Sequence, residues 1–309
     1  MIGNADKVLA YPDRLATFAA GDPVMPITAE VHPSGRCNQC CRYCKAPKSG
    51  LVMTAAEADD LARQMEEVGI RGVTISGGGE PTLGPWRSFL GRKFSAGLIT
   101  NGDLPVSEYS GLSWVRFSVD SCRPETYRKV RGVEWPDCLE DNIRRAIEQT
   151  RVGIQAVITP ESLDDVVWIT SWARRIGAAY IHIRPNDYSD NPTWFNVNLT
   201  ALLTTYNRNE RFKVIIRDEK RRPASAGVCY AGHFRITIAP DLNCYVCACG
   251  MYRKSFGRVG KNDTLAQLLS GHQRAMVLRE HDRALCPSGG CVGAGINRAF
   301  DGLPEHEFL

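Results

Sequence analysis

The sequence predicts an α/β protein: a partial (β/α)6 barrel over residues 1–215, followed by a small C-terminal α+β extension over residues 216–309. Two observations predict this division. Six short strand-like runs joined through helix-like segments lie between residues 27 and 185, as in parallel βα units. From about residue 216 this alternation stops, and a strand–turn–strand pattern, a short helix and several cysteines follow.

Within the barrel, the clearest helix is expected over Thr54–Val68, because Thr54 and Glu57 form a capping box and Gly69 can end the helix. In barrels of this kind, chemistry collects where strands end and loops begin. The expected strands are Ile27–His32, Val73–Ile75, Leu98–Thr100, Val115–Val119, Ile154–Ile158 and Tyr180–Ile183, with further helices near residues 135–150 and 162–176.

In the extension, Ile236–Asn243 has the pattern of a strand, a turn and a second strand. A helix is expected to begin at Thr264, with Leu265, Leu268 and Leu269 as its apolar stripe.

Composition indicates an enzyme that works in water. The chain has 309 residues, of which 43% are hydrophobic, enough for one large domain and an appendage. A net charge of +4 is too small to indicate a nucleic acid or a membrane surface as partner. The first residues lack a signal-peptide pattern, and no apolar run approaches membrane-spanning length. We therefore expect a cytoplasmic protein.

The chain has twelve cysteines, which in an unsecreted protein indicate metal and redox chemistry rather than disulfides. Four lie within residues 37–44, and six lie between Cys229 and Cys291. Cys122 and Cys138 stand apart and are interpreted as small buried residues.

Cys37, Cys41 and Cys44 lie on one loop after the first expected strand. Three thiolates at this spacing can hold three irons of a [4Fe–4S] cube and leave the fourth iron open to a chelating molecule. Tyr43 places an aromatic ring beside that iron. A zinc site or a disulfide loop is the alternative, and Cys40 adds a second Cys-x3-Cys option.

This spacing, with an aromatic residue before the third cysteine, resembles the radical S-adenosylmethionine (SAM) superfamily. The resemblance implies that the open iron binds SAM, that the cluster cleaves it to a 5′-deoxyadenosyl radical, and that a flavodoxin or ferredoxin supplies electrons. Gly78, Gly79 and Glu80 resemble the Gly-Gly-Glu motif of the family, which contacts the SAM amino group. A glycine run alone is more often a turn.

Polar residues also end later strands. Asn101 and Ser118 end the third and fourth, Asp120 shares a strand face with Ser118, and Arg184 ends the sixth. The resemblance implies contacts from these residues to the carboxylate and ribose of SAM. Ordinary strand-end capping, or a salt bridge at the barrel rim for Arg184, is the alternative.

The extension resembles the Twitch and SPASM extensions of radical SAM enzymes, which hold auxiliary [4Fe–4S] clusters. Its length fits the Twitch form, which has one such cluster. The family places a hairpin ligand five residues after a turn glycine; here Leu242 occupies the turn position, and the fifth residue is Cys247. Cys244 is the alternative to Cys247, and the final pair is spaced x4 rather than x2. The expected ligands are Cys229, Cys247, Cys286 and Cys291.

Cys249 remains unassigned. If the strand stays extended, Cys247 and Cys249 face the same side, toward the auxiliary cluster. A thiol S–H bond is weak enough to donate hydrogen to a carbon radical, although a spare buried cysteine or a cluster ligand is the alternative.

The layout resembles the radical SAM enzymes of aminoglycoside biosynthesis, which implies an aminoglycoside substrate and inversion of one sugar carbon. Asp187 and Asp190 are candidates for an acidic wall around this polycation, or else solvated loop residues. A radical SAM dehydrogenase, a peptide-modifying SPASM enzyme and a zinc-stabilised binding protein are the other classes considered.

Overall fold

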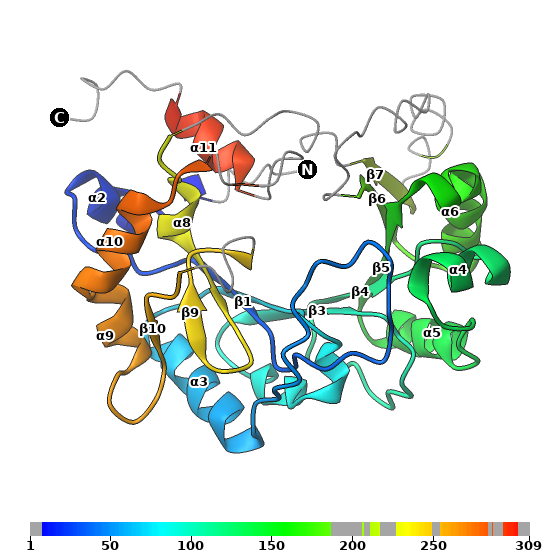
Figure 1. Ribbon diagram of the computed structural model, residues 1–309, viewed down its shortest axis with the longest axis horizontal. Coiled ribbons are helices and arrows are strands. Elements are labelled where there is room, and N and C mark those ends of the chain that lie inside the picture. The colour runs from blue at the N-terminus through cyan, green and yellow to red at the C-terminus, as the bar shows by residue number, and fades with distance from the viewer. Residues whose placement is uncertain are drawn as a thin grey trace.

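The computed structural model describes residues 8–186, 206, 211–216, 227–248, 254–283, 286 and 293–301. The strands in these residues form one curved, ten-stranded sheet in the order β10-β9-β8-β1-β2-β3-β4-β5-β6-β7 (Figure 1). They are β1 Thr28–Val31, β2 Gly72–Ile75, β3 Ser95–Thr100, β4 Trp114–Ser118, β5 Arg151–Ile158, β6 Tyr180–Pro185, β7 Lys213–Ile216, β8 Arg235–Ile238, β9 Asn243–Tyr245 and β10 Gly257–Arg258.

The pairing is parallel from β1 through β7, as expected for βα units. The α/β prediction and the six expected strands are confirmed, and β7 is added. β8 also pairs in parallel with β1, and β9 and β10 follow in antiparallel pairing. The extension therefore continues the sheet of the barrel rather than forming a separate one, and the predicted boundary at residue 216 stays a prediction.

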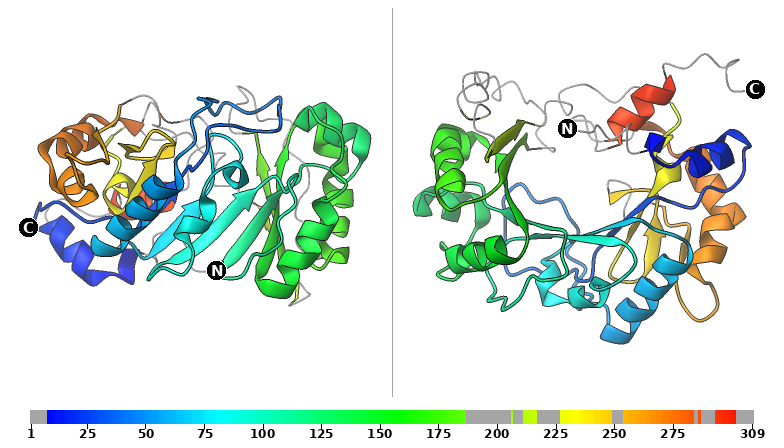
Figure 2. Two further views of the ribbon diagram at one scale, coloured as in Figure 1. Left: turned by 90° about the horizontal axis from the view of Figure 1, so that it is seen from below. Right: turned by 180° about the vertical axis from the view of Figure 1, so that it is seen from behind.

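Helices cover the outer side of the curved sheet, with α4, α5 and α6 outside one half and α3, α9 and α10 outside the other (Figures 1 and 2). The capping box of Thr54 and Glu57 is present at the start of α3, and the helix beginning after Thr264 is confirmed. The helices are α2 Pro12–Ala19, α3 Ala55–Glu67, α4 Pro124–Arg131, α5 Leu139–Gln149, α6 Val166–Arg175, α8 Ala231–Phe234, α9 Leu265–Ser270, α10 His272–Glu280 and α11 Ala294–Asp301.

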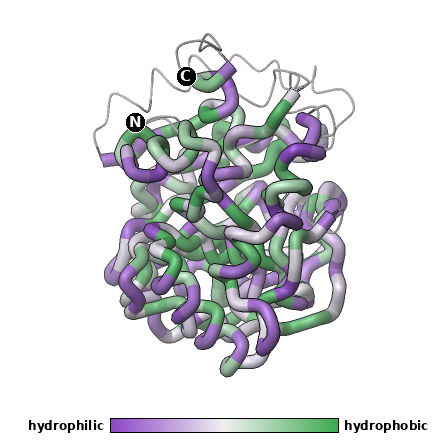
Figure 3. Tube along the Cα trace, turned by 90° about the vertical axis from the view of Figure 1, so that its left-hand side faces the viewer, coloured by the Kyte–Doolittle hydropathy of each residue, from purple (hydrophilic) through white to green (hydrophobic). Residues whose placement is uncertain are grey.

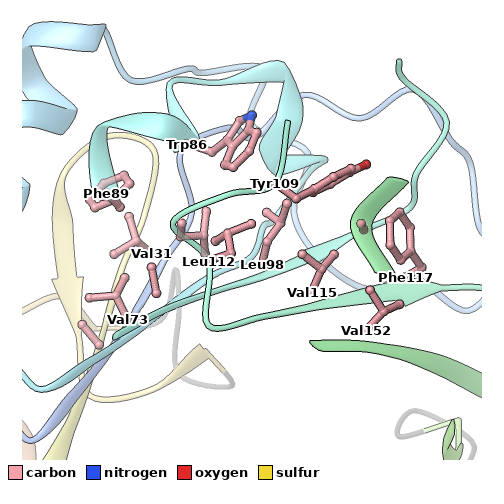
Figure 4. Close-up of a cluster of buried hydrophobic side chains, with 14 of the residues drawn as sticks. Val31, Val73, Trp86, Phe89, Leu98, Tyr109, Leu112, Val115, Phe117 and Val152 are labelled. Atoms are coloured by element: carbon pink, nitrogen blue, oxygen red, sulfur yellow. The ribbon is translucent and has the colours of Figure 1, made fainter. Parts of the chain in front are cut away.

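The core lies between this sheet and its outer cover. Between β2 and β3 two short 3-10 turns, Pro81–Leu83 and Trp86–Phe89, replace a helix and bury Trp86 and Phe89. Figure 4 shows these rings with the apolar side chains of β1 to β5. Hydrophobic and hydrophilic stretches alternate along the chain in Figure 3, as expected when helices and strands each have one buried face.

The hairpin of the extension turns at Leu242, whose φ of +65° lies in the left-handed region. This is the position where the family spacing expects glycine. The strand β9 ends at Tyr245, and a bend and a 3-10 turn follow at Val246 and Ala248. The expectation that an extended strand carries the side-chain alternation to Cys249 is therefore wrong, because the strand ends before Cys247.

No helix in the described part of the chain is long and apolar enough to cross a lipid bilayer.

Candidate active site

The three cysteines of the first motif lie on the loop that leaves the carboxyl end of β1. Cys37 and Cys41 are half-buried, and Cys44 is exposed. Burial raises the pKa of the Cys37 and Cys41 thiols, and the charge of Cys44 raises both further. The three thiols therefore lie within electrostatic range of one another. Within the described residues, no three His, Cys, Asp or Glu side chains lie close enough together to hold a single metal ion.

The Gly-Gly-Glu segment holds this loop through main-chain contacts. The N–H of Gly79 donates to the carbonyl of Ser34 (3.1 Å), and the N–H of Glu80 donates to that of Arg36 (2.7 Å). A Cβ at Gly79 would overlap the main-chain carbonyl of Arg36. Only glycine permits this approach between the two loops.

Glu80 is buried (3% exposed), and its carboxylate accepts hydrogen bonds from other residues of the protein. Its Oε1 accepts hydrogen bonds from Thr82 and from the Thr100 hydroxyl (2.6 Å), and its Oε2 accepts from the N–H of Asn101 (2.8 Å). Burial raises the pKa of Glu80 despite these hydrogen bonds. Its side chain thus braces the glycine segment against the end of β3.

The cysteine loop rests on the carboxyl end of α4, a helix that our sequence analysis missed. The N–H groups of Cys40 and Arg42 donate to the carbonyls of Arg131 (3.1 Å) and Val130 (3.0 Å), on either side of Cys41. Gly132 ends α4 with a φ of +72°, and a Cβ there would lie 2.8 Å from the carbonyl oxygen of Cys40. These contacts fix the backbone that carries Cys41.

A buried ion pair lies beneath the same loop. The Nε of Arg131 is 2.6 Å from Asp120 Oδ2, although its N–H direction does not make an aligned hydrogen bond. Tyr43 donates its hydroxyl to the same oxygen (2.8 Å), and Asp120 Oδ1 accepts from the N–H of Val157 (2.8 Å). Asp120 is 0% exposed, and its carboxylate takes part in this buried ion pair; a contact with the ribose of SAM stays a prediction.

The pair is electrostatically strong. Burial alone would lower the pKa of Arg131, but the charge of Asp120 outweighs it and raises that pKa well above its ordinary range. Burial raises the pKa of Tyr43 well above its usual value, since the charge of Arg131 lowers that pKa only in part and Asp120 raises it further. Both residues therefore keep their protons at any physiological pH.

Gln39 extends this network across the loop. Its Nε2 donates to Asp103 Oδ2 (2.7 Å) and to the hydroxyl of Tyr127 (2.9 Å), and its Oε1 accepts from Arg131 Nη1 (3.2 Å). The ammonium of Lys48 donates to the Gln39 carbonyl (2.6 Å). Sequence analysis did not single out these side chains, because nothing but the fold brings them together.

The remaining predicted SAM contacts lie at the same carboxyl edge of the sheet. Asn101 is buried, donates to Asn38 Oδ1 (2.7 Å) and accepts from the N–H of Asp103 (3.0 Å). Ser118 is half-buried at the end of β4, and Arg184 is half-buried on β6 in register with Val157. Their contact with SAM stays a prediction.

The second cysteine group is built from three segments. Cys229 is buried with Val24, Ile27 and Phe234. Val228, beside it, pairs with Asp282, and the N–H of Cys286 donates to the Arg283 carbonyl (2.9 Å).

The third segment is the end of the hairpin. Gly232 in α8 lies directly against Val246, next to Cys247. Cys229, Cys247 and Cys286 thus come from adjacent segments, whereas Cys291, Cys249, Asp187 and Asp190 lie outside the described residues.

Cys244 has different surroundings. It is 0% exposed within the main hydrophobic core, and burial raises the pKa of its thiol to about 12. Because Cys244 packs in this core whereas Cys229 packs in a separate cluster of buried residues, Cys247 is favoured as the hairpin ligand.

Comparison with known proteins identifies the first part of the chain. The model of the radical SAM superfamily matches residues 31–173, which include the cysteine loop, the Gly-Gly-Glu segment and α4. The chain contains a radical SAM domain. This domain implies a SAM-binding [4Fe–4S] cluster. Three thiols on one loop, which the glycine contact holds in place, are the donor type that such a cluster binds.

Two curated relatives match part of the chain. An S-adenosylmethionine-dependent nucleotide dehydratase of Flammeovirga pacifica is 30% identical over 48% of this chain and 59% of its own length. A probable GTP 3′,8-cyclase of Methanothermobacter thermautotrophicus is 28% identical over 44% of this chain and 48% of its own. The matched segments thus span only about half the length of these relatives.

Among solved structures, Streptococcus suis SuiB bound to its precursor peptide SuiA superposes with a TM-score of 0.67 at 15% identity. The superposition covers 96% of this chain and 78% of SuiB. It shows a shared fold that extends beyond the radical SAM domain.

Proposed function

We propose that this protein is a radical SAM epimerase that inverts one sugar carbon of an aminoglycoside, C5‴ of neomycin C, to give neomycin B. The observation that carries the radical SAM part is the three-cysteine loop, held between the glycine segment and α4. The epimerase part rests on resemblance. The length, the Cys37 motif and the Cys247-Ala248-Cys249 segment resemble neomycin C epimerase.

The cluster at Cys37, Cys41 and Cys44 would supply, with SAM, a 5′-deoxyadenosyl radical that removes a hydrogen atom from the sugar carbon. The chain positions and shields this chemistry. The main-chain bonds on either side of Cys41 fix the loop, and the buried Arg131–Asp120 pair keeps water from its inner side.

Cys249 would return a hydrogen atom to the opposite face of the planar carbon radical, because return to the same face would only regenerate substrate. The resulting thiyl radical takes up one electron and one proton to restore the thiol. Each inversion thus consumes one SAM, two electrons and one proton, yields methionine and 5′-deoxyadenosine, and leaves the substrate at its original oxidation state. A flavodoxin or ferredoxin would supply the electrons.

The topology of the sheet supports delivery from two directions. The cysteine loop leaves β1 at its carboxyl end, whereas β9 runs antiparallel to β8 and leads toward Cys247 at the end where β1 and β8 begin. A strand of four residues spans about 13 Å, so the two cysteine groups leave the sheet well apart. We assign a second [4Fe–4S] cluster to Cys229, Cys247, Cys286 and Cys291, as the electron source for the thiyl radical.

The test is anaerobic incubation of the reconstituted protein with SAM, dithionite and neomycin C in deuterated water. A thiol exchanges its proton with solvent, so we expect neomycin B with one deuterium at C5‴ and one 5′-deoxyadenosine per product. Cys249→Ala should consume SAM without inversion, while Cys122→Ala, a change of the same type elsewhere, should behave as wild type. An oxidised product without deuterium would instead indicate a dehydrogenase, and no SAM cleavage would refute the radical SAM reading.

A further inference from the structure

Arg131 lies buried beneath the cysteine loop, on the side of Cys41. We propose that Arg131 is a positioning residue that raises the reduction potential of the cluster held by Cys37, Cys41 and Cys44, acting through the sulfur of Cys41. This inference rests on the radical SAM part of the proposed function, and it is independent of the substrate.

The geometry fixes Arg131 and Cys41 relative to each other. Arg131 Nη1 lies 3.8 Å from Cys41 Sγ, within reach of an N–H···S hydrogen bond, and 3.2 Å from Gln39 Oε1. The main-chain carbonyls of Arg131 and Val130 accept hydrogen bonds from the N–H groups of Cys40 and Arg42. The same turn of α4 thus holds both the backbone around Cys41 and the guanidinium beside its sulfur.

The guanidinium of Arg131 lies between the carboxylate of Asp120 and the thiol of Cys41. Its Nε faces Asp120, while Nη1 faces Cys41. The side chain of Arg131 is 4% exposed, so solvent ions screen its charge weakly. Its Nη2 is buried and has no hydrogen-bond partner in the protein, so a donor remains for acceptors on the group that the thiols bind.

The electrostatic consequence has a definite sign. Reduction adds one negative charge to the cluster, and a cationic N–H donor at a ligating sulfur stabilises that charge. Arg131 therefore raises the reduction potential, whereas Asp120 lowers it from the other end of the guanidinium. Because Nη1 lies at Cys41 and Nε faces Asp120, Arg131 acts on the cluster through the sulfur of Cys41.

The experiment is a redox titration of the reconstituted full-length protein, followed by electron paramagnetic resonance. The signal that changes on addition of SAM identifies the cluster of the cysteine loop. Arg131→Met should lower its midpoint potential, and Arg131→Lys should give a smaller shift in the same direction. Asp120→Asn should raise it. Arg128→Gln removes an exposed arginine of the same helix, paired with Glu134, and should leave the potential unchanged.

The opposite shifts in potential expected for Arg131→Met and Asp120→Asn distinguish this electrostatic role from a purely structural one. Loosening of the loop would shift both variants in one direction and lower their iron content alike, and that result would overturn the proposal. If Arg131→Met does not fold, Asp120→Asn alone decides, since an unchanged or lower potential refutes the argument. Weaker SAM binding in Arg131→Met without any change in potential would assign Arg131 to SAM instead. A wild-type signal unaffected by SAM would refute the proposed function itself.

Discussion

Replacing Gly79 by alanine tests the contact between the Gly-Gly-Glu segment and the cysteine loop. The added Cβ would overlap the Arg36 carbonyl, which is main chain and cannot rotate away. Overpacking of this kind costs about 1–3 kcal/mol. The two main-chain hydrogen bonds from Gly79 and Glu80 would be lost when the loops separate, at about 1 kcal/mol each.

We therefore expect Gly79→Ala to lower the free energy of unfolding by about 3–5 kcal/mol. Urea unfolding of the cluster-free protein measures this value, and iron analysis after reconstitution reports whether the loop still binds its cluster. Gly72→Ala is the matched control. It lies in β2, one strand before the glycine segment, and its added Cβ would make an ordinary contact of 3.6 Å with Thr28 Cγ2.

Gly72→Ala should leave both stability and iron content near wild type. If Gly79→Ala also kept the wild-type free energy of unfolding and its iron, the two loops would not depend on glycine for their contact. The account of how the loop is held would then be wrong.

Three further predictions concern the extension. Burial lowers the pKa of His233 to about 4 in the folded protein. As the pH falls, His233 therefore binds a proton in the unfolded chain at a higher pH than in the folded protein. Stability should then drop by up to about 3 kcal/mol between about pH 6.5 and 4. His233→Phe, which keeps a ring against Phe18, should flatten that decline in urea unfolding; an equal decline would assign it to other groups. Leu242→Gly relieves about 1 kcal/mol of left-handed strain but removes a buried side chain worth about 2–5 kcal/mol. We therefore expect a lower free energy of unfolding in the same assay. A higher value would show that the strain outweighs the burial. Cys247→Ala should lose about four irons by iron analysis, whereas Cys244→Ala should keep them; the reverse result would exchange their roles.

The parallel strands and their helices were predictable because their signals are local. Short apolar runs mark the parallel strands, and the Thr54–Glu57 capping box marks α3. The helix α4 was missed although Pro124 at its start and Gly132 after its end are the usual signals, because Tyr127 and Val130 are its only buried apolar side chains and the third buried residue of that face is Arg131.

The buried network beneath the cysteines was not predictable. Arginine and aspartate are ordinarily exposed, and nothing in the sequence around Arg131 or Asp120 shows that the fold will pair them. The pairing of β8 with β1 was missed for a related reason, because it joins segments from opposite ends of the chain and depends on the assembled sheet.

That pairing has a consequence for how the protein is made. The second edge of the N-terminal strand β1 forms its hydrogen bonds only when β8, late in the chain, pairs with it. Until then, β1 presents an unpaired edge, and contacts between such distant segments form slowly. A ribosome-bound chain synthesised only as far as β7 therefore exposes an unpaired strand edge, which can pair with other chains. This edge lies directly next to the loop that must receive iron. We expect a fragment ending after Ile216 to aggregate on release, and cluster insertion to follow translation rather than accompany it.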